Sequence, residues 1–291
     1  MPHLRLAALS VLLLSAAHLP AQLTASSTLP ASLTAVPVMS WVNAVAANER
    51  TIIRPTLPIR YQMHSRDEKG DHIRDIIESR DGVVARLIAV DNRPLTREQD
   101  ELERARLNAT LNSPSEFARH HKRDEQGKDL ALNLLALMPE AMIYTYTPGQ
   151  PQEPDFPGLQ IVIDFKPNPS WQPPTTTSEA LTGLEGRLWI DAETKHMVRM
   201  EGHIAHPVNL GWGILVRIAK GGLLELEQRP GPNGRWVFSH FVERISARAL
   251  MVKTVNTNST FDSSSPRPIP PMSYQDAIHE LLNTPLPKSF P

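Results

Sequence analysis

The stretch that decides the fold reads LEGRLWIDAETKHMVRMEGHI and spans residues 184–204. From His196 to Ile204, apolar and polar side chains alternate, with Val198, Met200 and Ile204 on one side and Arg199, Glu201 and His203 on the other. A period of two with one apolar side is typical of an antiparallel strand that buries one face. Residues 191–195 form a turn, and residues 186–191 are expected to be the partner strand of a hairpin.

Similar signals continue on both sides of this hairpin. Turn residues separate short apolar-rich runs, most clearly in PGPNG at residues 230–234. The expected strands are 142–147, 159–166, 210–218, 223–228, 236–245 and 250–256. The second half of the chain therefore predicts a run of antiparallel hairpins.

The first half predicts one helix and further strands. Residues 37–48 place Val38, Trp41, Val42 and Val45 at helical spacing, so a short amphipathic helix should lay Trp41 on the core. Asp81-Gly82 is a strong hairpin signal, because such turns need a positive φ that glycine adopts without strain. The expected strands are 59–63, 71–79 and 83–90.

A helical pair at about 97–138 interrupts the strands. Thr96 with Gln99 and Ser113 with Glu116 fit capping boxes, which predicts helices at 97–112 and 114–138. Pro139 is expected to end the second helix. Residues 118–129, ARHHKRDEQGKD, have almost no apolar side chain, so we expect them to stand in solvent at the tip of the pair. A docking surface for a protein partner and a plain solvated face both fit this composition.

The two ends have their own signals. Residues 1–21 carry a weakly basic start, an apolar run and small residues before Ala21, which predicts a cleavable signal peptide and a periplasmic or secreted protein. Residues 22–36 are expected to be a flexible leader, and 37–262 to form one α+β domain built around an antiparallel sheet. Residues 263–291 are predicted to be a Pro-rich tail, with a linker at 263–271 and a short helix at 274–282. No later segment is apolar enough to cross a membrane after signal cleavage.

Composition excludes several classes of function. The 291 residues contain no cysteine, which excludes disulfides, thiolate metal sites and cysteine nucleophiles. Lys+Arg number 30 and Asp+Glu 31, a balance that argues against a nucleic-acid partner. No His-Glu-x-x-His, Gly-x-Ser-x-Gly or phosphate loop is present, so we predict neither a metal nor a cofactor. An enzymatic alternative would need a cleft in which His203 or His240 meets a carboxylate.

Large apolar residues gather on the predicted C-terminal strands. Trp189, Trp236, Phe238, Met197 and Met200 lie on or near them, with Trp212 and Met251 close by. A packed core would explain these residues. A curved sheet that encloses a cavity would explain them as well, because aromatic and methionine side chains suit an apolar ligand. The sequence leaves both interpretations open.

The segment 184–191 followed by 195–202 resembles a pattern in bacterial envelope proteins akin to the periplasmic lipoprotein carriers LolA and LolB. GWG at 211–213, KGG at 220–222 and LEQ at 226–228 are similar to segments of exported bacterial proteins, and the resemblance covers most of 37–262. It implies a strongly curved antiparallel sheet, an incomplete β-barrel, with helices packed on its concave side. Helices 38–48 and 130–137 would form the lid. The residues implied to line the cavity are Trp41, Trp189, Val198, Met200, Leu224, Leu226 and Phe238.

The expected function is therefore non-enzymatic binding of a lipid, a lipoprotein acyl chain or an apolar segment of another envelope protein. The alternative is an envelope sensor or scaffold that docks a protein partner through the polar helical pair.

Overall fold

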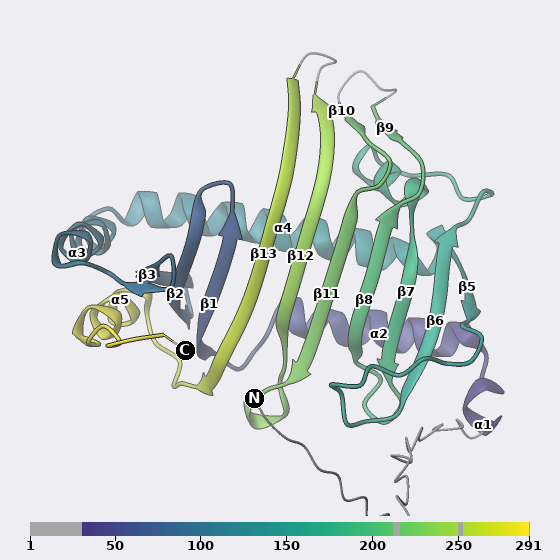
Figure 1. Ribbon diagram of the computed structural model, residues 1–291, viewed down its shortest axis with the longest axis horizontal. Helices are drawn as coiled ribbons and strands as arrows, with labels where there is room; N and C mark the ends of the chain where they lie inside the picture. Colours follow the sequence, from purple (N-terminus) through teal and green to yellow (C-terminus); the bar gives the residue numbers. More distant parts are fainter. Residues whose placement is uncertain (1–30, 212–215, 250–252, 291) are drawn as a thin grey trace, which may run out of the picture.

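One large antiparallel sheet organises the protein, and the computed structural model describes residues 31–211, 216–249 and 253–290 (Figure 1). The sheet has 13 strands, and its main path runs β4-β3-β2-β1-β13-β12-β11-β8-β7-β6-β5. Its end strands β4 and β5 do not pair with each other, so the sheet is open. The strands are β1 Ile59–Asp67, β2 Gly70–Ser79, β3 Gly82–Val90, β4 Arg93–Pro94, β5 Met142–Tyr146, β6 Gln160–Pro167, β7 Leu184–Asp191, β8 Met197–Ile204, β9 Val208–Leu210, β10 Val216–Ile218, β11 Leu223–Pro230, β12 Trp236–Ala249 and β13 Lys253–Pro268. The expected α+β class with an antiparallel sheet is confirmed.

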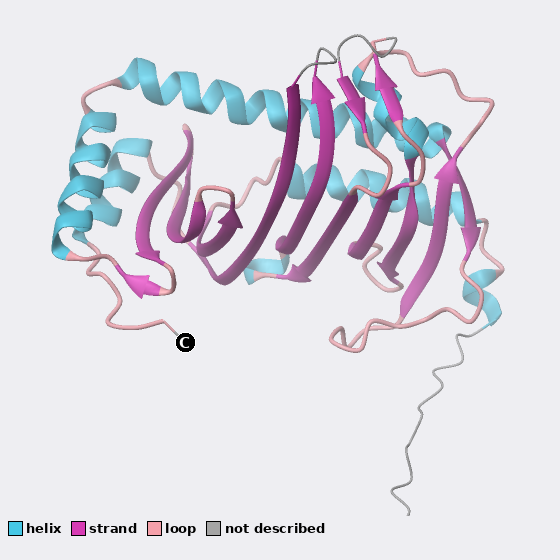
Figure 2. Ribbon diagram, turned by 45° about the horizontal axis from the view of Figure 1, so that its top comes forward, coloured by secondary structure: helices cyan, strands magenta, loops and turns pink. Residues whose placement is uncertain are grey.

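Two long helices cross the same face of this sheet, as Figures 1 and 2 show. They are α2 and α4, and we call the opposite face of the sheet the outer face. Two further helices, α3 and α5, pack together beside β2 and β3. The α-helices are α1 Ala31–Thr34, α2 Val38–Ile53, α3 Arg97–Leu111, α4 Pro114–Ala141 and α5 Tyr274–Asn283, and short 3-10 turns span Thr177–Gly183 and Pro232–Gly234.

Helix α2 forms where apolar spacing predicts it and runs one turn further than expected. Trp41, Val42, Val45 and Ile52 are buried on one side of it, as the helical period requires. Glu49 lies on that same buried side. The segment before α2 was predicted to be part of a flexible leader, and its last residues differ from that prediction. Residues 31–34 form α1, and Leu33 and Val36 pack against the core. The predicted signal peptide at 1–21 lies outside the described residues.

The helical pair confirms one of the two predicted capping boxes, and it corrects the other one and the predicted end of the second helix. The hydroxyl of Thr96 accepts a hydrogen bond from the amide of Gln99, whose side chain accepts one from the amide of Thr96. Ser113 makes no such side-chain bond, although α4 begins directly after it with Pro114. Pro139 does not end α4, which continues to Ala141. A proline within the last turn costs one backbone hydrogen bond, and the packing of this helix on α2 and the sheet compensates for it.

The hairpin of β7 and β8 contains an irregularity that strict alternation does not predict. Trp189 pairs with Arg199, but the next residue of β7, Ile190, pairs with Met197. Val198 is therefore the extra residue of a β-bulge. The bulge leaves Val198 in a buried cluster with Trp189 and Val162 rather than in the cavity wall, and it places Met197 and Met200 on the side of the helices. The predicted face of Val198 was wrong for this reason.

The C-terminal strands are longer than predicted. β12 continues to Ala249 and β13 runs to Pro268, so most of the stretch expected to be a linker is strand. Proline is tolerated there because the register between β1 and β13 shifts at Arg60 and Gln62, and Ser265 in the shifted part has φ 54°. The predicted strand 210–218 is interrupted, and its residues 212–215 lie outside the described residues.

Helix α5 is a core element rather than part of a loose tail. Tyr274, Ile278 and Leu281 are buried against Ile77 and Leu107 in a second apolar cluster. The guanidinium of the buried Arg86 donates to the backbone carbonyl oxygens of Leu281 and Thr284 at the end of α5 and to Asp100 of α3. These bonds hold α3 and α5 to β3.

Candidate functional site

A large cavity lies between the sheet and the two helices that cross it. Its volume is about 870 Å³, within the range of small-molecule sites. The helices contribute Val42, Val45 and Ile52 from α2 and Ala131, Leu134 and Met138 from α4. The sheet contributes Met63, Leu188, Met197, Met200, Leu224, Leu226, Phe238, Phe241 and Phe261. Most of the wall is therefore apolar and includes several methionines, whose flexible side chains adapt to irregular ligands.

The cavity brings together four of the seven residues implied to line it. Met200, Leu224, Leu226 and Phe238 contribute to its wall, and both expected lid segments do so as well. Val83 and Phe238 line the cavity and are nevertheless 39% and 37% exposed, so it opens to solvent beside them.

Three implied residues lie elsewhere. Trp41 is buried in the core between α2 and the sheet. Trp189 and Val198 are buried on the outer face. The indole Nε1 of Trp189 donates to the carbonyl oxygen of Pro151 at 2.9 Å, and the guanidinium groups of Arg187 and Arg199 lie 5.7 and 5.9 Å from its rings. A loop connecting β5 to β6 thus covers Trp189 on the side of the sheet away from the cavity.

A buried carboxyl group is the feature of the wall that sequence reasoning missed. Glu49 of α2 lines the cavity, and its Oε2 accepts a hydrogen bond of 2.6 Å from Nε2 of Gln228 on β11. Among the described residues, the second carboxyl oxygen and the Gln228 Oε1 have no hydrogen-bond partner. Burial raises the pKa of Glu49 to about 7. The helical spacing from Val45 and Ile52 could have revealed that Glu49 faces inward.

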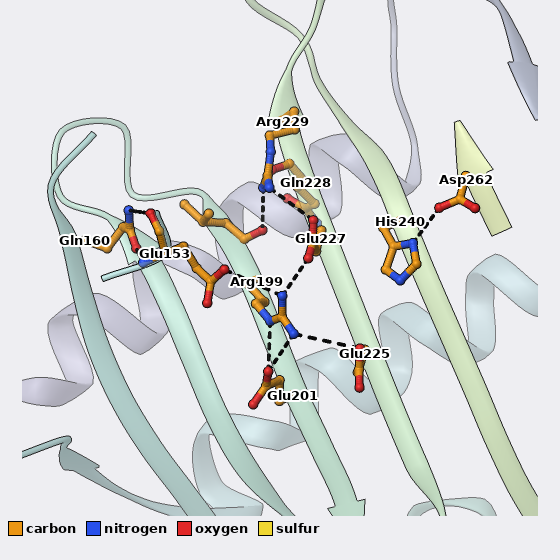
Figure 3. A network of polar contacts seen from close by, with 11 residues as sticks. Glu153, Gln160, Arg199, Glu201, Glu225, Glu227, Gln228, Arg229, His240 and Asp262 are labelled. Carbon is orange, nitrogen blue, oxygen red and sulfur yellow. Dashed lines mark hydrogen bonds and ion pairs between the residues drawn. The ribbon is translucent and has the colours of Figure 1, made fainter. Parts of the chain in front are cut away.

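The outer face carries a dense network of charges, shown in Figure 3. Arg199 lies at its centre and binds Glu227 at 2.7 Å and Glu201 at 2.6 Å, with Glu153 and Glu225 at 3.6 and 3.8 Å. Burial raises the pKa of Glu153. Each of these charged groups has a partner within the network. The network therefore keeps the outer face of β8 and β11 polar and links the two strands.

Both histidines named for an enzymatic alternative meet a carboxylate. Nδ1 of His240 lies 2.6 Å from Asp262, as Figure 3 shows, and Nε2 of His203 lies 3.1 Å from Glu185. In the described residues, neither ring has a serine or threonine hydroxyl as a hydrogen-bond partner, and no group of three metal-ligating side chains occurs there. Each dyad is a histidine–carboxylate pair, and His240 also lies in the wall of the cavity.

The polar segment 118–129 lies in α4 as a largely exposed stretch of helix. Arg54, which follows α2, binds Glu125 at 2.5 Å and Asp129 at 2.6 Å. Hydrogen bonds from Lys128 and Arg54 lower the pKa of Glu125 to about 2. Part of the segment therefore ties α4 to the end of α2.

Fold and cavity together define an open antiparallel-sheet protein with an apolar chamber beneath two crossing helices. Comparison of the chain with family models, with curated proteins and with solved structures gives no match. The resemblance to lipoprotein carriers therefore stays a prediction. Among the described residues, no helix is both long enough and apolar enough to span a bilayer.

Proposed function

We propose that this protein is an exported, non-enzymatic periplasmic protein that holds a lipid, an acyl chain or an apolar segment of another envelope protein. The observation that carries the proposal is the apolar cavity of about 870 Å³ between the sheet and helices α2 and α4. In this proposal the sheet acts as a strongly curved, incomplete barrel with both helices on its concave side. The ligand displaces water from the methionine and phenylalanine side chains of the wall.

The size of the hydrophobic effect supports an acyl chain as the occupant. Each methylene buried from water contributes about 0.8 kcal/mol, so a chain of about 16 carbons contributes on the order of 10 kcal/mol before binding costs. A micromolar complex requires about 8 kcal/mol, so this gain exceeds the requirement only before the loss of chain entropy and of free motion is deducted. The cavity is open to solvent beside the exposed Phe238 and Val83, which supports a binding mode with the polar end of the ligand at that opening.

The test uses a fluorescent palmitate with the purified protein, together with native mass spectrometry and lipid extraction of the protein as isolated. Leu226→Trp places a larger side chain on the cavity wall and is expected to weaken palmitate binding by about tenfold or more. Leu102→Trp makes the same change on α3, where Leu102 is 67% exposed, and should leave binding unchanged. A protein that is isolated empty and does not bind the palmitate would overturn the proposal.

A further inference from the structure

Charged side chains in the wall of the cavity gather where the wall opens to solvent. Apart from Glu49, the acidic and basic residues of the wall are Glu78, Arg80, Lys128 and Arg235. Arg80 lies in the turn after β2, three residues before the exposed Val83. Arg235 directly precedes β12, which carries the exposed Phe238. Each exposed apolar residue of the wall thus has an arginine close to it in the chain.

The acidic group at this opening is already fully used. Arg235 donates to both carboxylate oxygens of Glu78, at 2.5 and 2.8 Å, and the backbone amide of Ile59 donates to the same carboxylate at 3.2 Å. Lys128 binds Glu125 at 2.9 Å, a residue of α4 outside the wall. The wall therefore offers no spare carboxylate oxygen at its opening, and its basic residues outnumber its acidic one there.

Arg80 provides an unpaired positive charge. It is exposed, and within the described part of the chain it forms no ion pair. Asp276 on α5 is attracted weakly to Arg80, but its carboxylate accepts hydrogen bonds from the hydroxyl and is held by the cap residue Ser273. The guanidinium group of Arg80 is therefore available to a ligand in the cavity.

Two buried hydrogen-bond donors of the same wall also lack an acceptor. In the part of the chain that the structure describes, Nε of Arg235 and the hydroxyl of Ser239 have no hydrogen-bond partner. Ser239 is the extra residue of a β-bulge, because Phe238 and His240 on either side of it pair with consecutive residues of β11. Its hydroxyl is nearly inaccessible to water in this rotamer, and rotation about one bond turns it toward the cavity. A ligand oxygen that accepts these donors would recover the cost of leaving them unpaired.

We propose that the cavity selects an amphiphile with an oxyanion head group, a carboxylate or a phosphate, which Arg80, Arg235 and Ser239 bind at the opening. An oxyanion accepts hydrogen bonds from guanidinium and hydroxyl groups and neutralises the charge of Arg80. An alcohol or ester head leaves that charge unpaired, and a cationic head is repelled by it. The inference rests on the proposed function, because it assigns the head group of the ligand whose chain fills the cavity.

The experiment compares ligands that differ only in the head group. Laurate, dodecyl phosphate and dodecanol share one saturated chain, and each is used below its micelle concentration to displace fluorescent palmitate from the purified protein. The measurement is made at pH 6, because Glu49 in the same wall has a pKa of about 7 and is uncharged there. Both anions should bind about tenfold more tightly than dodecanol. The tighter of the two anions identifies the oxyanion that the site prefers.

Two variants test the assigned residues. Arg80→Gln should weaken the binding of both anions about fivefold and leave that of dodecanol nearly unchanged. Ser239→Ala should weaken the anions more than dodecanol, because a hydrogen bond to a charged oxygen is roughly twice as strong as one to a neutral oxygen. Both variants should keep the thermal midpoint of the wild type. Arg235 is left in place, because it also donates to the carbonyl oxygen of Leu57 and holds Glu78.

The matched controls lie outside the cavity wall. Arg93→Gln removes an exposed charge from β4, and Ser246→Ala removes a hydroxyl from the same strand as Ser239. Both should bind all three ligands as the wild type does. Equal affinity of the wild type for dodecanol and both anions would overturn the inference and leave the proposed function standing, as would an equal loss for all three ligands in Arg80→Gln and Ser239→Ala. A protein that binds none of these ligands, palmitate included, would overturn the proposed function itself.

Discussion

The carboxyl group of Glu49 and the amide of Gln228 face each other across the junction of helix α2 and strand β11, 2.6 Å apart and buried. Within the part of the chain that the structure describes, one oxygen of each group has no hydrogen-bond partner. A proton on the carboxyl removes the cost of burying a charge there, which is why its pKa lies at about 7 rather than 4.5. The wall of the cavity thus contains a group that titrates near neutral pH.

Replacing Glu49 by Gln should remove a pH dependence of stability. Between pH 4.5 and 7 the folded protein keeps a proton that the unfolded chain has lost, so the free energy of unfolding of the wild type falls as pH rises through this window. The loss is on the order of 3 kcal/mol and is complete above pH 7. Urea unfolding at pH 4.5 and 8 should show it in the wild type and not in Glu49→Gln. The control, Glu193→Gln at an exposed turn, should behave as the wild type.

Arg86→Leu should destabilise the protein by about 3 kcal/mol, because it removes the hydrogen bonds of the buried guanidinium to the carbonyl groups of Leu281 and Thr284 and its ion pair with Asp100. Chemical denaturation measures this loss. The same substitution at the exposed Arg93 should change the midpoint little. Equal effects at both positions would mean that the attachment of α5 does not depend on Arg86.

Phe117→Ala should lower the free energy of unfolding by about 3 kcal/mol. The ring of Phe117 stacks on that of Tyr274 in the second apolar cluster, with the ring centroids 4.0 Å apart. Leu130→Ala, in the same helix but 44% exposed, should cost under about 1 kcal/mol. Thermal unfolding compares the two variants. A similar shift in both would contradict the burial that the structure assigns to the first turn of α4.

Trp189→Phe should lower the stability of the protein without changing its affinity for a ligand. The substitution removes the hydrogen bond to Pro151, and the expected loss of stability is about 1 kcal/mol. Affinity for fluorescent palmitate should not change, because Trp189 lies on the outer face. A fall in affinity matching that of Leu226→Trp would instead place the indole in the binding site.

Local chemistry explains what the sequence could predict. The hairpin signalled by Asp81-Gly82, the Thr96 capping box and the buried side of α2 each depend on residues close together in the chain, and all three occur. The turn itself is formed by Arg80 and Asp81, and Gly82 begins β3 with φ 136°. The extension of β13 through Pro268 could not be predicted, since it depends on β1 as a distant partner. A polar, proline-containing stretch by itself is typical of a linker.

The candidate site was harder to predict than the fold, because a single extra residue changes which side chains share a face. The bulge at Val198 requires a register shift between β7 and β8 that no composition signals. It exchanges Val198 for Met197 in the cavity wall. Trp189 was misplaced for a different reason, since an apolar residue on a strand can be buried by a covering loop as well as by a core.

Pro139 has a consequence for the helix that covers the cavity. Proline has no amide hydrogen, so the carbonyl oxygen of Leu135, four residues earlier in α4, lacks its regular helical donor. Leu135 and Pro139 both line the cavity. The backbone hydrogen bond that Pro139 removes therefore belongs to the stretch of α4 that lines the cavity, where a helix with a missing bond bends more easily than a regular one.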